Sequence, residues 1–197
     1  MNSPLFLKSE TRTRGLTLIE LMVTLSVLAI LMVVAIPSFQ AMIASSSLST
    51  ASNDLLTTFA QARSNAIRRG ARVTVCKSAN GAQCTTTGNW EQGWIMFNDD
   101  DHSTTNPNVD TGESITFTAP ALSSGLVMKA NLDYVSYASD GQPKNMNGSP
   151  YFGTIRICST AESLSNDKRA RDLVLNSAGR IIIKRPSSIA AACPAPT

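Results

Sequence analysis

One carboxylate interrupts the longest apolar stretch of the chain. Residues 16–36 form a 21-residue run in which Glu20 is the only charged side chain. A carboxylate there costs about 2–3 kcal/mol to place in a membrane and is functional by default. If the chain were cut after Gly15, Glu20 would become the fifth residue, and the new α-amino group of Leu16 could pair with it. Such pairing offsets the desolvation of both charges and fixes the axial register of neighbouring helices.

The residues around this run distinguish three kinds of N-terminal segment. The run is long enough to cross a hydrocarbon core of about 30 Å as a helix. Lys8, Arg12 and Arg14 precede it, which predicts that this end stays cytoplasmic and that the bulk of the chain lies outside. A secretory signal peptide has a shorter apolar region, followed by a small-residue cleavage site, whereas here Gly15 comes first. A plain single-pass anchor leaves Glu20 unexplained.

Four cysteines form a second set of reactive side chains. In the oxidising compartment outside the membrane they predict two disulfides, for which three pairings are possible. We favour Cys76–Cys84, which closes a short loop, and Cys158–Cys193, which ties the carboxyl tail to a strand. The chain has no CxxC motif and a single histidine, so we expect neither a metal site nor a cofactor.

Catalytic chemistry is not predicted. The single histidine, His102, lies in an acidic loop without a nucleophile nearby, whereas a triad needs an imidazole oriented by a third group. The loop superficially resembles a calcium loop, but Thr104 replaces the required glycine and an aspartate replaces the bidentate glutamate. We therefore expect a solvated acidic loop in a protein that is not an enzyme. The residues at loop positions 1, 3, 5 and 12 are Asp99, Asp101, Ser103 and Asp110.

Charge is unevenly distributed along the chain. Residues 91–140 hold eight acidic side chains against one lysine, and residues 156–197 hold seven basic against three acidic ones. Without residues 1–15 the remaining chain has 14 basic and 13 acidic side chains, so bulk charge gives no support for a nucleic-acid partner. The basic end could meet phosphate backbones or the acidic face of a neighbouring subunit. Its candidate residues are Arg180, Lys184 and Arg185, with Arg169 and Arg171 as further ones.

A long helix must position the N-terminal groups. Pro37 removes one helical hydrogen bond and predicts a bend. Beyond it, apolar residues recur three or four apart, which predicts an amphipathic helix over 37–70 that packs on the domain's own sheet and stops at Gly70. Three serines at 45–47 weaken the pattern locally. The apolar positions are Phe39, Met42, Ile43, Leu48, Leu55, Leu56, Phe59, Ala62, Ala66 and Ile67.

From Ala71 onward the apolar period changes to two, which predicts a β-rich head over 71–197. We expect one antiparallel domain, with a tight hairpin at 176–179. Along its last strand Arg180 and Lys184 would share a face while Arg185 points away. The fold class is α+β, a long N-terminal helix on an antiparallel sheet, in the form of a lollipop. The expected strands are 73–76, 94–97, 115–117, 134–137, 154–157, 173–175 and 180–183.

The sequence Gly15-Leu16-Thr17-Leu18-Ile19-Glu20-Leu21-Met22 resembles the class III signal of type IV pilins and type II secretion pseudopilins. The resemblance implies that residues 1–15 are a leader, which prepilin peptidase removes between Gly15 and Leu16 before the new terminus is methylated. It also implies that Glu20 guides docking into the pilus. Pro37 matches the helix-kinking proline of pilins, whereas Leu16 stands where most pilins have Phe.

The head resembles the GspH/FimT branch of pilins, which includes the minor pilins FimU and FimT. The resemblance implies a type IV minor pilin that primes assembly and lies in a tip complex. Its partners would be major and minor pilins, prepilin peptidase and the inner-membrane assembly platform. It would lie in the inner membrane with a periplasmic head, then in the extracellular pilus. The motifs that carry the resemblance are 90–99, Gly112-Glu113, 153–158 and Gly179-Arg180.

Two alternatives stay open. One is a minor pseudopilin of a type II secretion system, which shares the membrane span, the cleavage site and the head fold. The other is a pilus-borne DNA receptor for natural transformation. DNA-binding FimT proteins carry Gly-Arg-x-Arg in the last hairpin, but here Ile182 stands in place of the second arginine. Lys184 and Arg185 would have to compensate for it.

Overall fold

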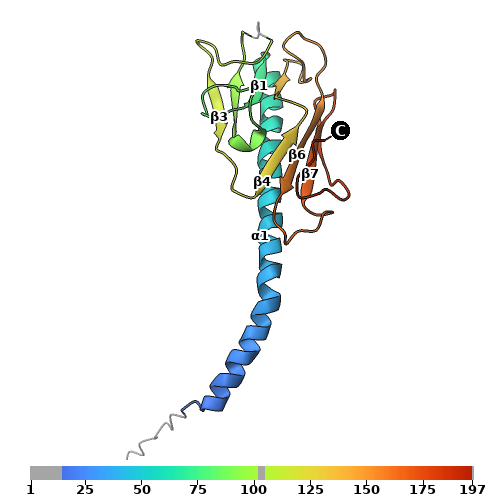
Figure 1. Ribbon diagram of the computed structural model, residues 1–197. Helices are drawn as coiled ribbons and strands as arrows, with labels where there is room; N and C mark the ends of the chain where they lie inside the picture. The colour runs from blue at the N-terminus through green and yellow to red at the C-terminus, as the bar shows by residue number, and fades with distance from the viewer. Residues whose placement is uncertain (1–14, 102–104, 197) are drawn as a thin grey trace, which may run out of the picture. The chain divides into compact units, whose positions relative to one another are not determined.

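The computed structural model describes residues 15–101 and 105–196 and divides the chain into two compact units, 1–39 and 40–197. Helix α1 (Leu18–Arg69) begins in the first unit and ends in the second (Figure 1). In the first unit nearly every described residue is exposed. An 18-residue window of α1 near the N-terminus has a mean hydropathy of 2.7 and no buried residue, so the helix is long and apolar enough to span a membrane.

The two ends of α1 are set by local side-chain and backbone chemistry. Thr17 caps its start, because the Thr17 hydroxyl accepts a hydrogen bond of 3.2 Å from the backbone N–H of Glu20. The helix ends at Arg69, and Gly70 follows with a φ of 65°, the left-handed conformation that favours glycine after a helix. The serines at 45–47 do not interrupt the helix, and the bend expected at Pro37 stays a prediction.

The second unit contains two four-stranded antiparallel sheets, which confirms the predicted α+β class with an antiparallel β head. The strand β4 was not among the expected strands, because its sequence Leu-Val-Met-Lys-Ala does not alternate between apolar and polar residues. The first sheet, in spatial order, consists of β3 (Ile115–Ala119), β2 (Trp94–Asn98), β1 (Val73–Lys77) and β5 (Tyr134–Tyr137). The second consists of β4 (Leu126–Ala130), β6 (Gly153–Ser159), β7 (Ala170–Leu175) and β8 (Ile181–Lys184).

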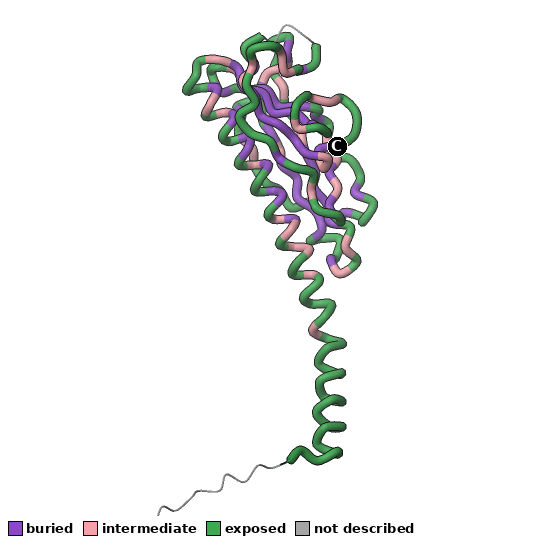
Figure 2. The backbone as a smooth tube through the Cα atoms, turned by 90° about the vertical axis from the view of Figure 1, so that its left-hand side faces the viewer, coloured by how far each residue is buried: buried purple, intermediate pink, exposed green. Residues whose placement is uncertain are grey.

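The largest hydrophobic cluster lies between α1 and the inner faces of both sheets (Figure 2). A short 3-10 helix, η1 (Trp90–Gln92), adds Trp90, whose ring meets Phe59 of α1 edge to face at 5.8 Å. Trp94 donates a hydrogen bond of 3.2 Å to the hydroxyl of Thr58. Every buried residue among those described lies between Leu48 and Pro196, so residues 40–197 carry a complete core without the apolar part of α1. This part of the chain can therefore fold as a separate head.

The apolar stripe of α1 is buried over a shorter length than its pattern predicts. Leu48, Leu55, Phe59, Ala62 and Ala66 pack against the sheets as expected. Four other members of the stripe are more than half exposed. These four are Phe39, Met42, Ile43 and Ile67.

Candidate functional site

The N-terminal processing segment lies outside regular structure. Gly15, Leu16 and Thr17 are exposed and precede α1, so the Gly15–Leu16 peptide bond is accessible. Residues 1–14, which include the basic residues of the expected leader, lie outside the described residues. Glu20 is exposed in the first turn of α1, where a negative charge also suits the helix dipole.

Thr17 is a functional candidate that the sequence reasoning missed. Its hydroxyl binds the backbone of Glu20, and the spacing Thr-x-x-Glu is that of a capping box. This spacing was visible in the sequence as a helix-start signal. The hydrogen bond that starts the helix uses the backbone N–H of Glu20 and leaves its carboxylate without a bond to a described residue.

Both disulfides of the head have the pairing favoured above. Cys76 is joined to Cys84, with their Cα atoms 5.6 Å apart. Cys158 of β6 is joined to Cys193, with their Cα atoms 5.9 Å apart. The second bond, together with the buried Ile189, holds the carboxyl-terminal segment on the outer face of the second sheet.

The acidic loop differs from the expected solvated loop at its first residue. Asp99 is only 2% exposed, and its carboxylate accepts a hydrogen bond of 2.5 Å from the hydroxyl of Thr74. The carboxylate of Glu113 accepts hydrogen bonds from the backbone N–H groups of Asp100, Asp101 and Asp110. A protein carboxylate thus organises the backbone of this loop. His102, Ser103 and Thr104 lie outside the described residues.

Three of the basic side chains in the carboxyl-terminal third are used inside the head. Arg156 forms a two-pronged ion pair with Asp172, at 2.7 and 2.8 Å, and donates a hydrogen bond to the Pro194 carbonyl. Arg169 and Arg171 are buried and donate to backbone carbonyls. Burial lowers the pKa of Arg171, and the nearby positive charge of Arg185 adds to the effect. Arg169 and Arg171 therefore do not face a phosphate backbone, which corrects their inclusion among the candidates.

The three principal basic candidates are all exposed, but they do not form one row. The strand β8 begins at Ile181, so Arg180 belongs to the hairpin turn before it, not to the strand as expected. Lys184 lies at the other end of β8, opposite Asp172, and Arg185 follows it. Lys184 lies four positions after Arg180, which in an extended strand corresponds to about 13 Å.

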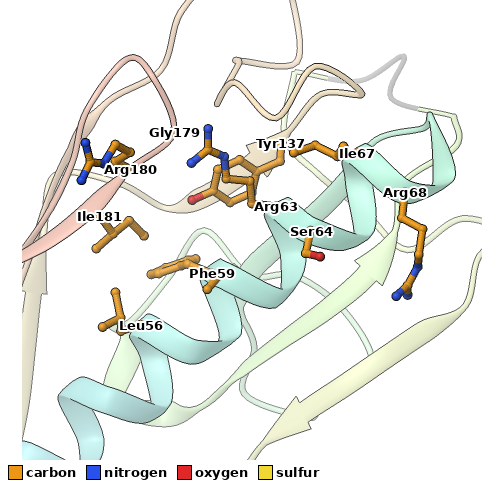
Figure 3. Close-up of a pocket in the computed structure, with 11 residues that line it drawn as sticks. Leu56, Phe59, Arg63, Ser64, Ile67, Arg68, Tyr137, Gly179, Arg180 and Ile181 are labelled. Carbon is orange, nitrogen blue, oxygen red and sulfur yellow. The ribbon is translucent and has the colours of Figure 1, made fainter.

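Arg180 lines a groove between α1 and the β7–β8 hairpin, which we call the α1–hairpin groove (Figure 3). Its volume is about 580 Å³. The floor is apolar, and the charged side chains that line it are all arginines. Its lining residues from α1 are Leu56, Phe59, Ala60, Arg63, Ser64, Ile67 and Arg68, and the others are Tyr137, Gly179, Arg180 and Ile181.

Arg63 holds the hairpin against the helix. Its Nε donates to the Gly141 carbonyl at 3.0 Å, and its Nη2 donates to the Ala178 carbonyl at 2.9 Å. Tyr137 lies buried beneath, where desolvation raises the pKa of its hydroxyl. Nothing in the apolar pattern of the helix distinguishes Arg63 from a solvated surface arginine, so the sequence reasoning missed it.

Two glycines make this close approach possible. Gly179 has a φ of 78°, and a Cβ added there would lie 2.3 Å from the Gly141 carbonyl oxygen. Gly141 has a φ of 73°, and a Cβ there would lie 2.7 Å from Cδ1 of Ile67. The glycine of the Gly179-Arg180 motif thus has a packing reason, because only a residue without a side chain brings the hairpin this close to Arg63.

Comparison with protein families gives two matches along the chain. Residues 51–179 match the family described as type II transport protein GspH, and residues 11–36 match the prokaryotic N-terminal methylation motif. The first match covers more than half of the chain, so the chain belongs to the GspH family. It is a structural subunit of the type IV pilin and pseudopilin class, which assembles with other pilins.

Two solved structures resemble the chain in fold. Both are crystal structures of FimU, a type IV minor pilin of Pseudomonas aeruginosa strain PAO1, in two crystal forms. They are 18% and 19% identical to this chain, with a TM-score of 0.49 in each case. The aligned regions cover 72% of this chain and 93% and 98% of the FimU chains. Comparison with curated proteins gives no match.

Proposed function

We propose that the chain is a minor pilin of a type IV pilus, incorporated through the apolar part of α1 and Glu20. The observation that carries the proposal is the apolar surface of this helix, which no described part of the chain covers. Such a surface is stable only in lipid or against other apolar helices. A pilin satisfies both conditions in turn, because its helix first spans the membrane and is then packed among the helices of the filament.

Glu20 is the residue that gives this packing a register. Once prepilin peptidase has cut the chain between Gly15 and Leu16, the new terminal amine lies close in sequence to the Glu20 carboxylate. In an apolar environment an isolated carboxylate is costly, so the arrangement that brings an ammonium group to it is strongly preferred. Methylation of this amine preserves its positive charge. Pro37 serves the same assembly by bending the helix.

A comparison of Glu20→Ala with Thr17→Ala tests the role of the carboxylate in subunit contacts. Glu20→Ala removes the carboxylate, whereas Thr17→Ala removes the capping hydroxyl and keeps Glu20. We expect Glu20→Ala to abolish incorporation into sheared pili, measured by immunoblot, and Thr17→Ala to retain it. Mass spectrometry of the membrane form establishes that the leader is removed in both variants. Normal pilus numbers and normal incorporation of the Glu20→Ala chain would refute the proposal.

We further propose that this subunit lies in a tip complex that primes assembly, with the head as its interaction surface. Membership of the GspH family supports a minor subunit of either a type IV pilus or a type II secretion pseudopilus. Deletion of the gene separates the two systems. We expect loss of surface pili with normal protein secretion, whereas loss of secretion with normal pili would assign the chain to the pseudopilus.

DNA binding is a second candidate function, supported by the exposure of Arg180, Lys184 and Arg185. None of the three forms an ion pair with another residue in the described ranges. This candidate predicts that the head of residues 40–197 retards duplex DNA at low salt, and that added salt releases it. Arg180→Ala and Lys184→Ala would each weaken the complex. Unchanged DNA mobility with excess head at low salt would exclude it.

A further inference from the structure

The α1–hairpin groove has a positive charge that its own surroundings do not neutralise. Arg63, Arg68 and Arg180 line it, and no acidic side chain does. Arg68 bonds to the neutral side chain of Asn65, and Arg63 bonds only to carbonyl groups. Among the described residues, none of the three arginines forms an ion pair. The groove therefore attracts a negatively charged partner.

The arginines also have N–H donors that make no hydrogen bond with a described residue. A guanidinium has five N–H donors in a rigid fork that matches a carboxylate. Arg63 uses two of them, which fixes its position, and three have no partner among the described residues. The Arg180 side chain makes no hydrogen bond with a described residue and lies beside Gly179 at the mouth of the groove (Figure 3).

The floor of the groove offers apolar surface beside these charges. Ile67 belongs to the apolar stripe of α1, yet its side chain is 52% exposed. Leu56 and Ile181 are half-buried at the other end of the groove, beside the buried Phe59 (Figure 3). A volume of about 580 Å³ is comparable to that of small-molecule binding clefts. An occupant with one apolar anchor and one carboxylate would use both features.

We propose that the α1–hairpin groove binds an acidic segment of a neighbouring pilin, with an apolar side chain on Ile67 and a carboxylate on Arg180 and Arg63. This inference rests on the proposed role in pilus assembly and names a contact surface for it. A protein segment fits better than a nucleic-acid backbone, because phosphates gain nothing from an apolar floor. The cations are also dispersed: Arg68 points away from the hairpin in Figure 3, and Lys184 lies at the far end of β8.

Site-specific photocrosslinking in the full set of pilins tests this assignment. The full-length chain carries p-benzoylphenylalanine at Ser64, an exposed position of the groove, in cells that make the other pilins. We expect a crosslink to the head of another pilin, at a peptide that contains Asp or Glu beside an apolar residue. Crosslinks to DNA, crosslinks only to peptides without a carboxylate, or no crosslink would each overturn the proposal. The same probe at Asn53, an exposed residue of α1 outside the groove, is the control.

Charge variants then test the role of Arg180. Arg180→Glu is expected to reduce the Ser64 crosslink about tenfold, as for the loss of a charge-assisted hydrogen bond, and Arg180→Lys to retain part of it. Lys168→Glu makes the same change in net charge at an exposed site outside the groove and should leave the crosslink unchanged. An unchanged crosslink in Arg180→Glu refutes the groove assignment alone. Normal incorporation of Glu20→Ala would instead refute the assembly function.

Discussion

Replacing Gly179 by alanine tests whether close packing of the hairpin on α1 holds the groove together. Gly179 has a φ of 78°, and an added Cβ would lie 2.3 Å from the Gly141 carbonyl oxygen. Ordinary contact begins at 3.4 Å, so the hairpin or the turn at Gly141 must move by about 1 Å. The same carbonyl accepts the Nε hydrogen bond of Arg63, and Ala178 beside Gly179 accepts the Nη2 bond. The substitution therefore disturbs both bonds.

The expected loss of stability has two parts. A non-glycine residue in the left-handed region costs about 1–2 kcal/mol. A hydrogen bond to a charged group contributes about 1.5–3 kcal/mol, so weakening those of Arg63 adds about 2 kcal/mol. The total is about 3–4 kcal/mol, a large share of the stability of a domain of this size.

Gly148 provides a matched control for the backbone part. Its φ is 84°, close to that of Gly179, but a Cβ added there would meet nothing within 4 Å. Gly148→Ala should therefore lose only about 1–2 kcal/mol. The effect of alanine on the unfolded chain is common to both variants and cancels in the comparison.

Urea unfolding of the oxidised head, residues 40–197, measures both variants. Trp90 and Trp94 are buried and report the transition by fluorescence. We expect Gly179→Ala to lose about 2 kcal/mol more than Gly148→Ala, and the excess to shrink when Arg63 is replaced by leucine, because the two sites are coupled. Equal losses for the two glycine variants would refute the argument, since they would show that the close approach contributes nothing.

Three further predictions concern the rest of the head. Removal of the Cys158–Cys193 bond should cost about 4 kcal/mol and removal of Cys76–Cys84 about 2.6 kcal/mol, because the first closes the longer loop; equal shifts of the urea midpoint would contradict this. Asp172→Asn should cost about 3–5 kcal/mol by leaving its buried arginine partner uncompensated, whereas a loss below about 1 kcal/mol would show that the pair is solvated. Burial raises the pKa of all three tyrosines, that of Tyr151 to about 12. Because these folded-state pKa values exceed the unfolded value of 10, their contribution to stability is complete below pH 10 and is lost as the pH rises through them. If an ultraviolet titration showed that the tyrosines of the folded head ionise at pH 10, their pKa values would not be raised and this prediction would be refuted.

The sequence predicts most about this chain where the physical signal is local. The apolar run with its single acidic residue can be recognised from the order of residues alone. The family match over residues 11–36 agrees with its interpretation as the N-terminus of an N-methylated pilin. The stop of α1 at Gly70 depends on the conformation of one residue. In each case the neighbouring residues along the chain determine the outcome.

The division of the head into two sheets could not be predicted in the same way. It depends on which strands pair across long stretches of chain, such as β4 with β6, and a short strand with a lysine gives little periodicity. The burial of the apolar stripe has the same cause. Ile67 and Phe59 both belong to the apolar stripe, yet Phe59 is buried in the core and Ile67 is 52% exposed.

Counting charged residues in the sequence does not show which of their side chains are exposed. In the carboxyl-terminal third, the structure changes the interpretation of the basic residues for this reason. Of its seven basic side chains, Arg156, Arg169 and Arg171 are buried and bonded within the head. The net charge of +4 over residues 156–197, from seven basic and three acidic side chains, is therefore not all on the surface of the head. Arg180 remains exposed, and the other two arginines that line the groove, Arg63 and Arg68, come from α1. The positive site thus arises where the helix meets the hairpin. A partner that recognises it must contact both elements, so any change that separates them should weaken binding even when every arginine is kept.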